Sequence, residues 1–234
     1  MDEIEWWEFD NAKELAEQAA GDIGFVIESA VEAHGDARLA LPGEDGLAPV
    51  FSALAKSKGF DWSKVSLLPT ADRLVPLAGE QSHHGRLDGW FAAKGAEILS
   101  LVDESALSDP VEAARLADAR MSLLRWPLDL VCLGMDAEGG TAGLRPGADL
   151  DRVLNAPRGR RAVGVRGTEG DLVTLTGPTL TEARTVMIVI TGAGKRAVLE
   201  QAIKEGPLSS RPIGRLLATI DSPVDVFWTG EEVA

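Results

Sequence analysis

The sequence predicts an α/β fold, a mainly parallel sheet with helices on both faces, and three observations support this prediction. Apolar runs short enough for buried strands alternate with longer segments of helical periodicity along the chain. The run at 130–133 is apolar at all four positions, which is typical of a strand buried on both faces. A glycine-rich loop follows that strand, at the end where parallel sheets bind ligands. We expect a single domain, 1–234.

The first helix is predicted over residues 12–33, because apolar residues recur there at helical spacing. Asp10 or Asn11 can cap its start, and Gly35 is suited to end it. Three further helices are predicted at 87–97, 109–124 and 212–219. Another is predicted directly after the loop at 42–47, a short one is predicted to end near Arg184, and one is predicted to begin near Lys195. The predicted strands are 5–9, 38–41, one that leads to Arg73, 98–102, 130–133, 162–166, 172–176, 186–190 and 224–229.

Charge and composition limit the classes of function. Lys and Arg number 23 against 37 Asp and Glu, a net charge of −14, which argues against nucleic acid or an anionic membrane as a partner. The only cysteine, Cys132, lies in the apolar run, so it cannot form a disulfide within the chain and is expected to be a small core residue. No apolar run is long enough to span a membrane and no signal-peptide pattern is present, so we expect a cytoplasmic protein.

The loop at 134–147 is the first candidate for a binding site. Its glycines let the backbone approach a ligand closely, and its N–H groups can then face an anion or a developing oxyanion. The alternative is a plain glycine-rich turn after a core strand. The residues by themselves leave both interpretations open, because one glycine loop is a weak signal.

Residues 129–147, DLVCLGMDAEGGTAGLRPG, resemble the signature of the 6-phosphogluconolactonase family, approximately DLVLLGMGxDGHTASLFPG. The matching positions are Leu133, Gly134, Met135, Gly139, Thr141, Ala142, Leu144, Pro146 and Gly147. Gly140 stands where the family has its catalytic histidine, Asp136 replaces a glycine, Glu138 an aspartate and Arg145 a phenylalanine. The resemblance extends from Trp6 to Trp228 and implies the fold that this family shares with glucosamine-6-phosphate and ribose-5-phosphate isomerases. The sequence from Thr141 to Gly147 resembles that of the lactonases more than that of the aminosugar isomerases.

Other segments share this resemblance. The family has a phosphate-binding loop at 42–47, of which Gly43 remains, while Glu44 and Asp45 add negative charge. A second family signature, DERxVPxxxxxSN, is similar to the segment that contains Arg73 and, in place of the asparagine, His83. The family's Ala-Arg and Thr-Gly-x-x-Lys sequences correspond to segments 183–184 and 191–195.

The resemblance implies hydrolysis of 6-phospho-D-glucono-1,5-lactone to 6-phosphogluconate, with a phosphorylated sugar lactone as partner and without a cofactor or metal. The residues expected to contact the substrate are Gly43, Arg73, Gly139, Gly140, Thr141, Arg184 and Lys195. Glu138 or His83, or its neighbour His84, is the expected base. Structural roles are the alternatives: an ion pair for Arg73, a surface lysine for Lys195 and exposed loop histidines.

Two other functions stay open at this point. One is a catalytically impaired relative that binds a sugar phosphate or a protein partner. The other is a lactonase with an altered substrate, suggested by the changed loop at 42–47. The sequence makes no prediction about the oligomeric state.

Overall fold

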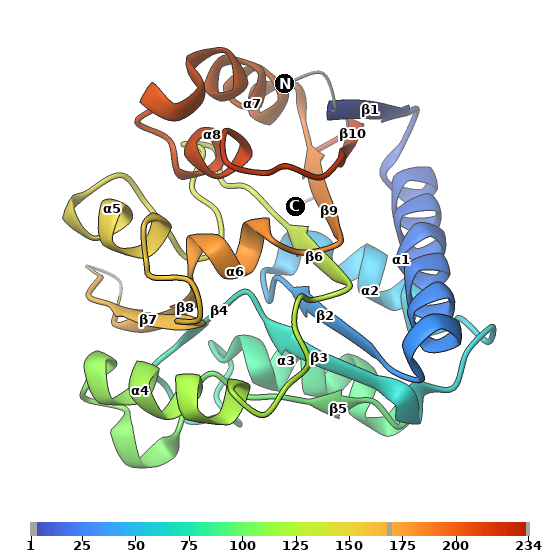
Figure 1. The fold of residues 1–234 in the computed structure, drawn as a ribbon. Coiled ribbons are helices and arrows are strands. Elements are labelled where there is room, and N and C mark those ends of the chain that lie inside the picture. The colour runs from blue at the N-terminus through green and yellow to red at the C-terminus, as the bar shows by residue number, and fades with distance from the viewer. Residues whose placement is uncertain (1–3, 168–169, 233–234) are drawn as a thin grey trace.

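A seven-stranded sheet, in which every neighbouring pair of strands is parallel, forms the centre of the protein (Figure 1). The computed structural model describes residues 4–167 and 170–232. The strand order is β1-β10-β9-β6-β2-β3-β5. These strands are β1 (Ile4–Phe9), β2 (Ala37–Leu41), β3 (Val65–Pro69), β5 (Glu97–Ile98), β6 (Leu130–Leu133), β9 (Thr185–Thr191) and β10 (Val224–Thr229). The predicted fold class, with its mainly parallel sheet, is therefore confirmed.

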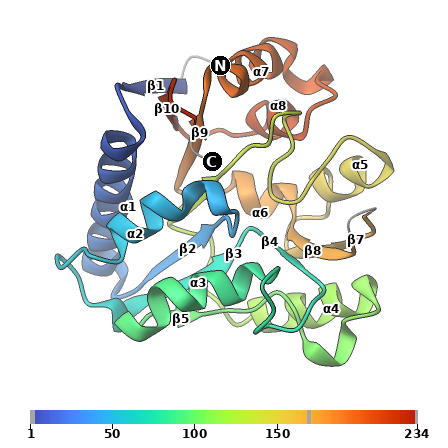
Figure 2. The same cartoon turned by 180° about the vertical axis from the view of Figure 1, so that it is seen from behind.

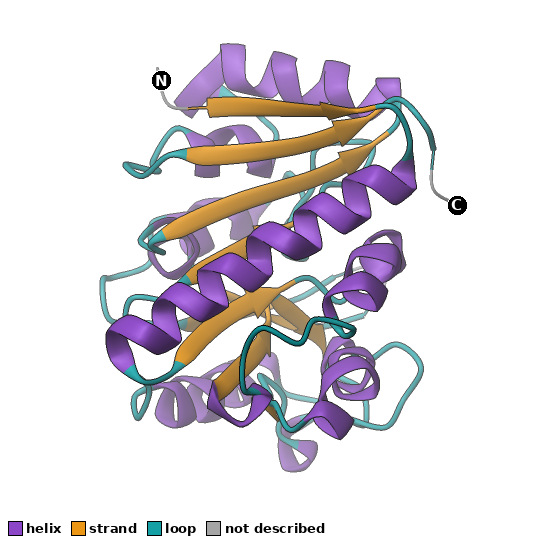
Figure 3. Ribbon diagram, turned by 90° about the vertical axis from the view of Figure 1, so that its right-hand side faces the viewer, coloured by secondary structure: helices purple, strands orange, loops and turns teal. Residues whose placement is uncertain are grey.

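Helices cover both faces of this sheet (Figures 2 and 3). The α-helices are α1 (Ala12–His34), α2 (Ala48–Leu54), α3 (His83–Phe91), α4 (Pro110–Met121), α5 (Ala148–Leu154), α6 (Gly177–Thr181), α7 (Ala193–Glu205) and α8 (Pro212–Leu217). One hydrophobic cluster joins α1, α2 and α3 to one face, and a second joins α4, α6, α7 and α8 to the other. None of the helices within 4–167 and 170–232 is long and apolar enough to cross a membrane.

Alternating side chains of the central strands supply both clusters. In β6, Leu130 and Cys132 contribute to the cluster under α1, whereas Val131 and Leu133 contribute to the opposite one. All four residues are at most 1% exposed, which explains why the run carries no polar residue. Burial raises the pKa of the Cys132 thiol and keeps it protonated, as expected for a core residue.

The order of the strands reverses between β2 and β6. From β2 the chain continues outward to β3 and β5, and from β6 it continues in the other direction to β9 and β10. The loops that leave two such strands separate from one another, which opens a crevice at their carboxyl ends. The loops at 42–47 and 134–147 are therefore placed side by side at the position where ligands bind in folds of this kind.

A second, three-stranded antiparallel sheet was not predicted. It consists of β4 (Ala71–Arg73), β8 (Leu172–Leu175) and β7 (Ala162–Val165), in that order. The predicted strands 162–166 and 172–176 exist, but they pair with each other and with β4 and not with the main sheet. This small sheet places Arg73 at the end of β4.

Several predicted boundaries were wrong, including the end of the helix predicted at 109–124, which stops at Met121. The strand predicted at 98–102 is limited to Glu97–Ile98, because the Ser100 hydroxyl donates to the Val102 carbonyl and accepts from the Val102 N–H, which turns the chain. The helix predicted at 87–97 spans His83–Phe91, since Ser82 caps its start by accepting from the Gly85 N–H, and the predicted end falls in β5. The helix predicted at 12–33 is confirmed, with Asn11 as its cap and Gly35 in the left-handed conformation at its end.

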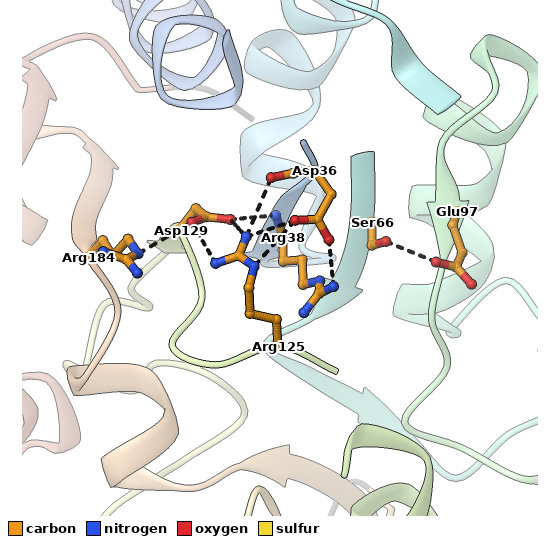
Figure 4. A network of polar contacts seen from close by, with 7 residues as sticks. All are labelled: Asp36, Arg38, Ser66, Glu97, Arg125, Asp129 and Arg184. Carbon is orange, nitrogen blue, oxygen red and sulfur yellow. Dashed lines mark hydrogen bonds and ion pairs between the residues drawn. The ribbon is translucent and has the colours of Figure 1, made fainter. Parts of the chain in front are cut away.

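A network of ion pairs fixes the amino ends of three central strands (Figure 4). Asp129 directly precedes β6 and is 2% exposed, and its carboxylate accepts from the Arg38 N–H of β2 at 2.9 Å. The same carboxylate pairs with Arg125 at 2.9 Å and with Arg184, which precedes β9, at 3.5 Å. Arg125 also pairs with Asp36, at 3.0 Å. A buried carboxylate is stable only when its charge and lone pairs are matched in this way.

Replacement of Asp129 by alanine is expected to lower the free energy of unfolding by about 2–4 kcal/mol, because the Arg38 N–H and two guanidinium groups lose a buried acceptor. Urea denaturation measures this change. The control is Glu182→Ala, which removes an exposed pair with Arg158 and is expected to change the free energy by less than about 1 kcal/mol. Equal effects of the two variants would contradict the role assigned to the network.

Candidate functional site

A cavity of about 650 Å³ lies at the carboxyl ends of the central strands. It is lined by the loops after β2 and β6, the end of β9 and the small antiparallel sheet. Five of the residues predicted from the sequence contribute to its lining: Arg73, His83, Gly140, Thr141 and Lys195. Its other charged lining residues are Glu44, Asp72, Asp136, Arg145, Asp149 and Arg166. The volume is within the range of about 300–1,000 Å³ typical of small-molecule sites.

The loop after β6 is held by its own hydrogen bonds. The Asp136 Oδ1 atom accepts from the Glu138 N–H at 3.0 Å and from the Gly140 N–H at 2.7 Å. The Asp136 carbonyl accepts from the Gly139 N–H at 3.2 Å, and the Thr141 N–H donates to the Leu144 carbonyl at 3.2 Å. The N–H groups from Gly139 to Thr141 therefore donate within the loop, and the expectation that they are free to face an anion was wrong.

Gly139 does not line the cavity and instead packs against the segment at the start of α8. Its φ angle is +85°, and a β-carbon added there would lie 2.8 Å from the Arg211 side chain at the start of α8. The Gly139 carbonyl also accepts from the Ile213 N–H at 3.2 Å. Arg211 is in turn paired with Glu205 of α7 at 2.9 Å. The role expected for Gly139 in substrate contact thus becomes one of packing the loop against α7 and α8.

His83 lies at the start of α3 with one ring nitrogen fixed. Its Nδ1 atom is 2.7 Å from the Ala71 carbonyl. A carbonyl oxygen can only accept, so Nδ1 carries the proton, and in the neutral ring Nε2 has the free lone pair. His84 does not line the cavity, and its Nε2 is 3.4 Å from the Ile98 carbonyl. The structure therefore separates the two histidines, and only His83 is placed for contact with a ligand.

Asp72 holds the start of α3 beside the cavity. Its side chain is fully buried, and its two carboxylate oxygens accept from the His83 N–H at 2.7 Å and from the His84 N–H at 3.1 Å. Burial raises the pKa of the Asp72 carboxyl, while these two hydrogen bonds oppose the rise by favouring the charged form. A carboxylate at a helix N-terminus is favourable, so Asp72 positions His83.

Gly43 also supports His83 and does not line the cavity. A β-carbon on Gly43 would lie 2.2 Å from the β-carbon of His83. The Gly43 carbonyl accepts from Arg86 of α3 at 2.9 Å, which joins the loop after β2 to this helix. Only glycine permits so close an approach, so a side chain at position 43 requires a shift of the start of α3.

Arg73 and Lys195 approach the cavity from different sides. Arg73 ends β4, and Lys195 lies in the first turn of α7, which directly follows β9. The free N–H groups and dipole of a helix N-terminus attract an anion, and a lysine there adds to that attraction. Two cations of different geometry thus contribute to the lining of the same cavity.

Two predicted residues lie elsewhere. Glu138 is exposed and does not line the cavity. Arg184 lies at the amino end of β9, whereas Lys195 follows its carboxyl end, so the full strand of seven residues separates them. At about 3.3 Å per residue this is roughly 20 Å. Arg184 belongs to the structural network of Asp129, and its assignment to the substrate site is corrected accordingly.

The sequence interpretation missed the cavity residues Asp136, Arg145 and Arg166. Asp136 and Arg145 were noted as departures from the family signature, and a charged residue in place of a glycine or phenylalanine beside a binding loop is the signal that could have identified them. Among the residues that the structure describes, no group of three or more histidine, cysteine or acidic side chains is arranged to hold a metal ion.

These features define an α/β protein with a small-molecule cavity, lined by charged groups of both signs, at the carboxyl ends of a parallel sheet. The family model for glucosamine-6-phosphate isomerases/6-phosphogluconolactonase matches residues 10–228, and the chain belongs to this family. It is 33% identical over 224 residues to a 6-phosphogluconolactonase of Rhizobium meliloti, covering 94% of this chain and 96% of that one. A second 6-phosphogluconolactonase, from Mesorhizobium japonicum, is 31% identical and covers 95% and 94%.

A solved structure supports the same assignment. The crystal structure of a 6-phosphogluconolactonase from Shewanella baltica superimposes with a TM-score of 0.90 at 27% sequence identity. The alignment covers 97% of this chain and 98% of that one. The resemblance inferred from the sequence signatures is therefore confirmed over nearly the whole chain.

Replacement of Gly43 by alanine is expected to lower the free energy of unfolding by about 1–3 kcal/mol, because the added methyl group overlaps His83. Thermal and urea denaturation measure the loss. Gly89→Ala is the control, since Gly89 lies within α3 itself and an added β-carbon there meets no atom within 4 Å. It is expected to leave stability unchanged or raise it. A Gly43 variant as stable as wild type would contradict this packing.

Acid should weaken the support of the loop by Glu205. Hydrogen bonds from Gln201 and Ser209, with a contribution from Arg211, lower the pKa of Glu205 to about 2 from an ordinary value of 4.5. Because the folded-state pKa is the lower one, the stabilisation is complete above about pH 4.5 and is lost as pH falls toward 2.

Glu205→Gln is therefore expected to be less stable than wild type at pH 6, with the difference shrinking toward pH 2 in urea denaturation at a series of pH values. The control is Leu208→Ala, an exposed apolar residue in the adjacent segment, whose effect should not vary with pH. A Glu205→Gln deficit that stays constant with pH would show that this carboxylate does not act through its charge.

Proposed function

We propose that this chain hydrolyses 6-phospho-D-glucono-1,5-lactone to 6-phosphogluconate, a step of the pentose phosphate and Entner-Doudoroff routes. The main supporting observation is that this family member has a cavity at the carboxyl ends of the parallel sheet whose lining includes four cations, balanced by four carboxylates, although the whole protein has a net charge of −14. Relatives that match it over more than 90% of both chains are 6-phosphogluconolactonases. The single domain and the cytoplasmic location stay predictions.

The reaction is the attack of water on the carbonyl carbon of the lactone. Arg73 and Lys195 bind the phosphate group, the guanidinium by paired hydrogen bonds and the ammonium as a point charge. Arg145 and Arg166, the other cations of the lining, stabilise the oxyanion that develops on the carbonyl oxygen. This replaces the expected role of the loop N–H groups, which donate within the loop.

The Glu44 carboxylate determines the orientation of the substrate in the cavity. The Glu44 Oε2 atom is buried without a hydrogen-bond donor among the described residues, at the place where the family has its phosphate-binding loop. A phosphate group would be repelled there, whereas a sugar hydroxyl can donate to this oxygen. The phosphate is therefore directed toward Arg73 and Lys195 and the hydroxyl groups toward Glu44.

The test is hydrolysis of freshly generated 6-phosphogluconolactone, followed through coupled 6-phosphogluconate dehydrogenase and corrected for the spontaneous rate. A rate above that of buffer supports the proposal. A rate equal to that of buffer, together with measurable binding of 6-phosphogluconate, would leave a catalytically inactive relative that binds sugar phosphates.

Arg73→Ala and Lys195→Ala are each expected to lower kcat/KM for the phosphorylated lactone by about 10–100-fold, because each removes a charged hydrogen bond to phosphate. With glucono-1,5-lactone, which lacks the phosphate, the loss is expected to be less than about threefold. The matched control, Arg184→Ala, removes a cation at the opposite end of the sheet and should retain the wild-type kcat/KM. Equal losses with both lactones would contradict the assignment of the two cations to the phosphate.

A further inference from the structure

Asp136 lines the cavity, and one of its two carboxylate oxygens is used for structure. Oδ1 accepts from the N–H groups of Glu138 and Gly140, which fixes the plane and direction of the carboxylate. Oδ2 accepts no hydrogen bond from the described residues, and Asp136 lines the cavity. A side chain with one oxygen anchored and the other available is suited to position a water molecule and take its proton.

We propose that Asp136 is the general base of this lactonase, acting through Oδ2. The inference rests on the proposed function and adds to it the residue that activates water. The family signature has a glycine at this position and therefore assigns no catalytic role to it.

Gly140 is the residue that makes room for this carboxylate. A β-carbon added to Gly140 would lie 2.4 Å from Asp136 Oδ2 and 2.9 Å from its Cγ, closer than real β-carbons approach other atoms. A side chain at position 140 and the carboxylate of Asp136 therefore exclude each other in this conformation. Because a histidine at 140 would begin beside Oδ2, the carboxylate serves the same part of the cavity as that histidine would.

The other acidic groups are less suited to this role. Both oxygens of Asp72 accept from N–H groups at the start of α3, and Glu138 is exposed outside the lining. Glu44 also lines the cavity with an unpartnered buried oxygen, and the binding mode proposed above assigns that oxygen to a substrate hydroxyl group. His83, with its Nε2 lone pair, is the one rival base among the predicted residues that line the cavity, and the experiment must separate it from Asp136.

The proton balance of the step is simple. The water oxygen bonds to the carbonyl carbon, the carbonyl π pair moves to its oxygen, and one water proton moves to Asp136 Oδ2. The oxyanion then reforms the carbonyl as the bond from carbon to the ring oxygen breaks, and the ring oxygen receives the proton from Asp136. The new carboxylic acid loses its remaining proton to solvent, and Asp136 is again a carboxylate.

Asp136→Asn is the central variant, because the amide keeps an oxygen that can accept the two loop N–H bonds while removing the base. We expect kcat to fall by about 10²–10⁴-fold. KM and the calorimetric affinity for 6-phosphogluconate should change less than threefold, which shows that the loop is intact. His83→Gln and Glu138→Gln are compared under the same conditions and are expected to lose less than about tenfold in kcat.

The exchange of positions 136 and 140 supplies a second test. Gly140→Ala should lower kcat as the added carbon displaces the carboxylate, whereas the double variant Asp136→Gly/Gly140→His should recover activity relative to Asp136→Gly by introducing an imidazole. Its pH profile should gain an inflection near pH 6–7, the range of imidazole titration, that wild type lacks. The phosphate of the substrate titrates equally in both enzymes and cancels in this comparison.

The outcomes separate two failures. A wild-type rate equal to that of buffer overturns the proposed function itself. An active wild type with an Asp136→Asn variant that keeps more than half of kcat overturns only the assignment of the base, as does a larger loss in His83→Gln or Glu138→Gln. Loss of 6-phosphogluconate binding together with kcat in Asp136→Asn would make Asp136 a structural residue of the loop.

Discussion

The parallel alignment of the seven strands is the constraint on which the rest of the structure depends. It brings all amino ends to one edge of the sheet and all carboxyl ends to the other, so the two edges can carry different kinds of charge. At the amino edge, the buried Asp129 joins β2, β6 and β9 through matched ion pairs. At the carboxyl edge the loops diverge and leave a cavity with charged groups. The buried ion-pair network and the cavity are thus separated by the length of one strand.

This separation explains how a strongly acidic protein can bind an anion. Arg73, Arg145 and Lys195 lie in the cavity lining, so they act on a bound ligand at short range, where Coulomb attraction is strongest. Charges on the outer surface are screened beyond about 8 Å at physiological salt, so the net charge of −14 weakens binding much less than its size suggests. In the proposed binding mode, the buried Glu44 oxygen limits where a phosphate group can lie and so contributes orientation and not affinity.

The sequence predicted the fold where local patterns determine structure. The strand 130–133, the strand 224–229 and the helix that Asn11 caps were all found, because burial periodicity and capping are properties of neighbouring residues. The small antiparallel sheet was missed, since pairing between β4 and β8 joins segments about a hundred residues apart and leaves no local signal. The turn at Ser100 was missed because one hydroxyl, bonded to the backbone two residues on, overrides an apolar pattern.

The site was predicted only in part, for a related reason. The positions of Arg73 at a strand end and Lys195 at a helix start allowed both to be predicted as cavity residues. The conformation of the loop after β6, in contrast, depends on side-chain hydrogen bonds that a sequence signature does not show. Asp136 accepts the N–H groups of Glu138 and Gly140, so the residue that departs from the family pattern is also the one that holds the loop. A carboxylate can stabilise the turn and face the ligand at once, whereas a glycine can do neither. An aspartate at position 136 is therefore compatible with an unchanged fold, because its carboxylate supplies an acceptor for two N–H groups of the loop.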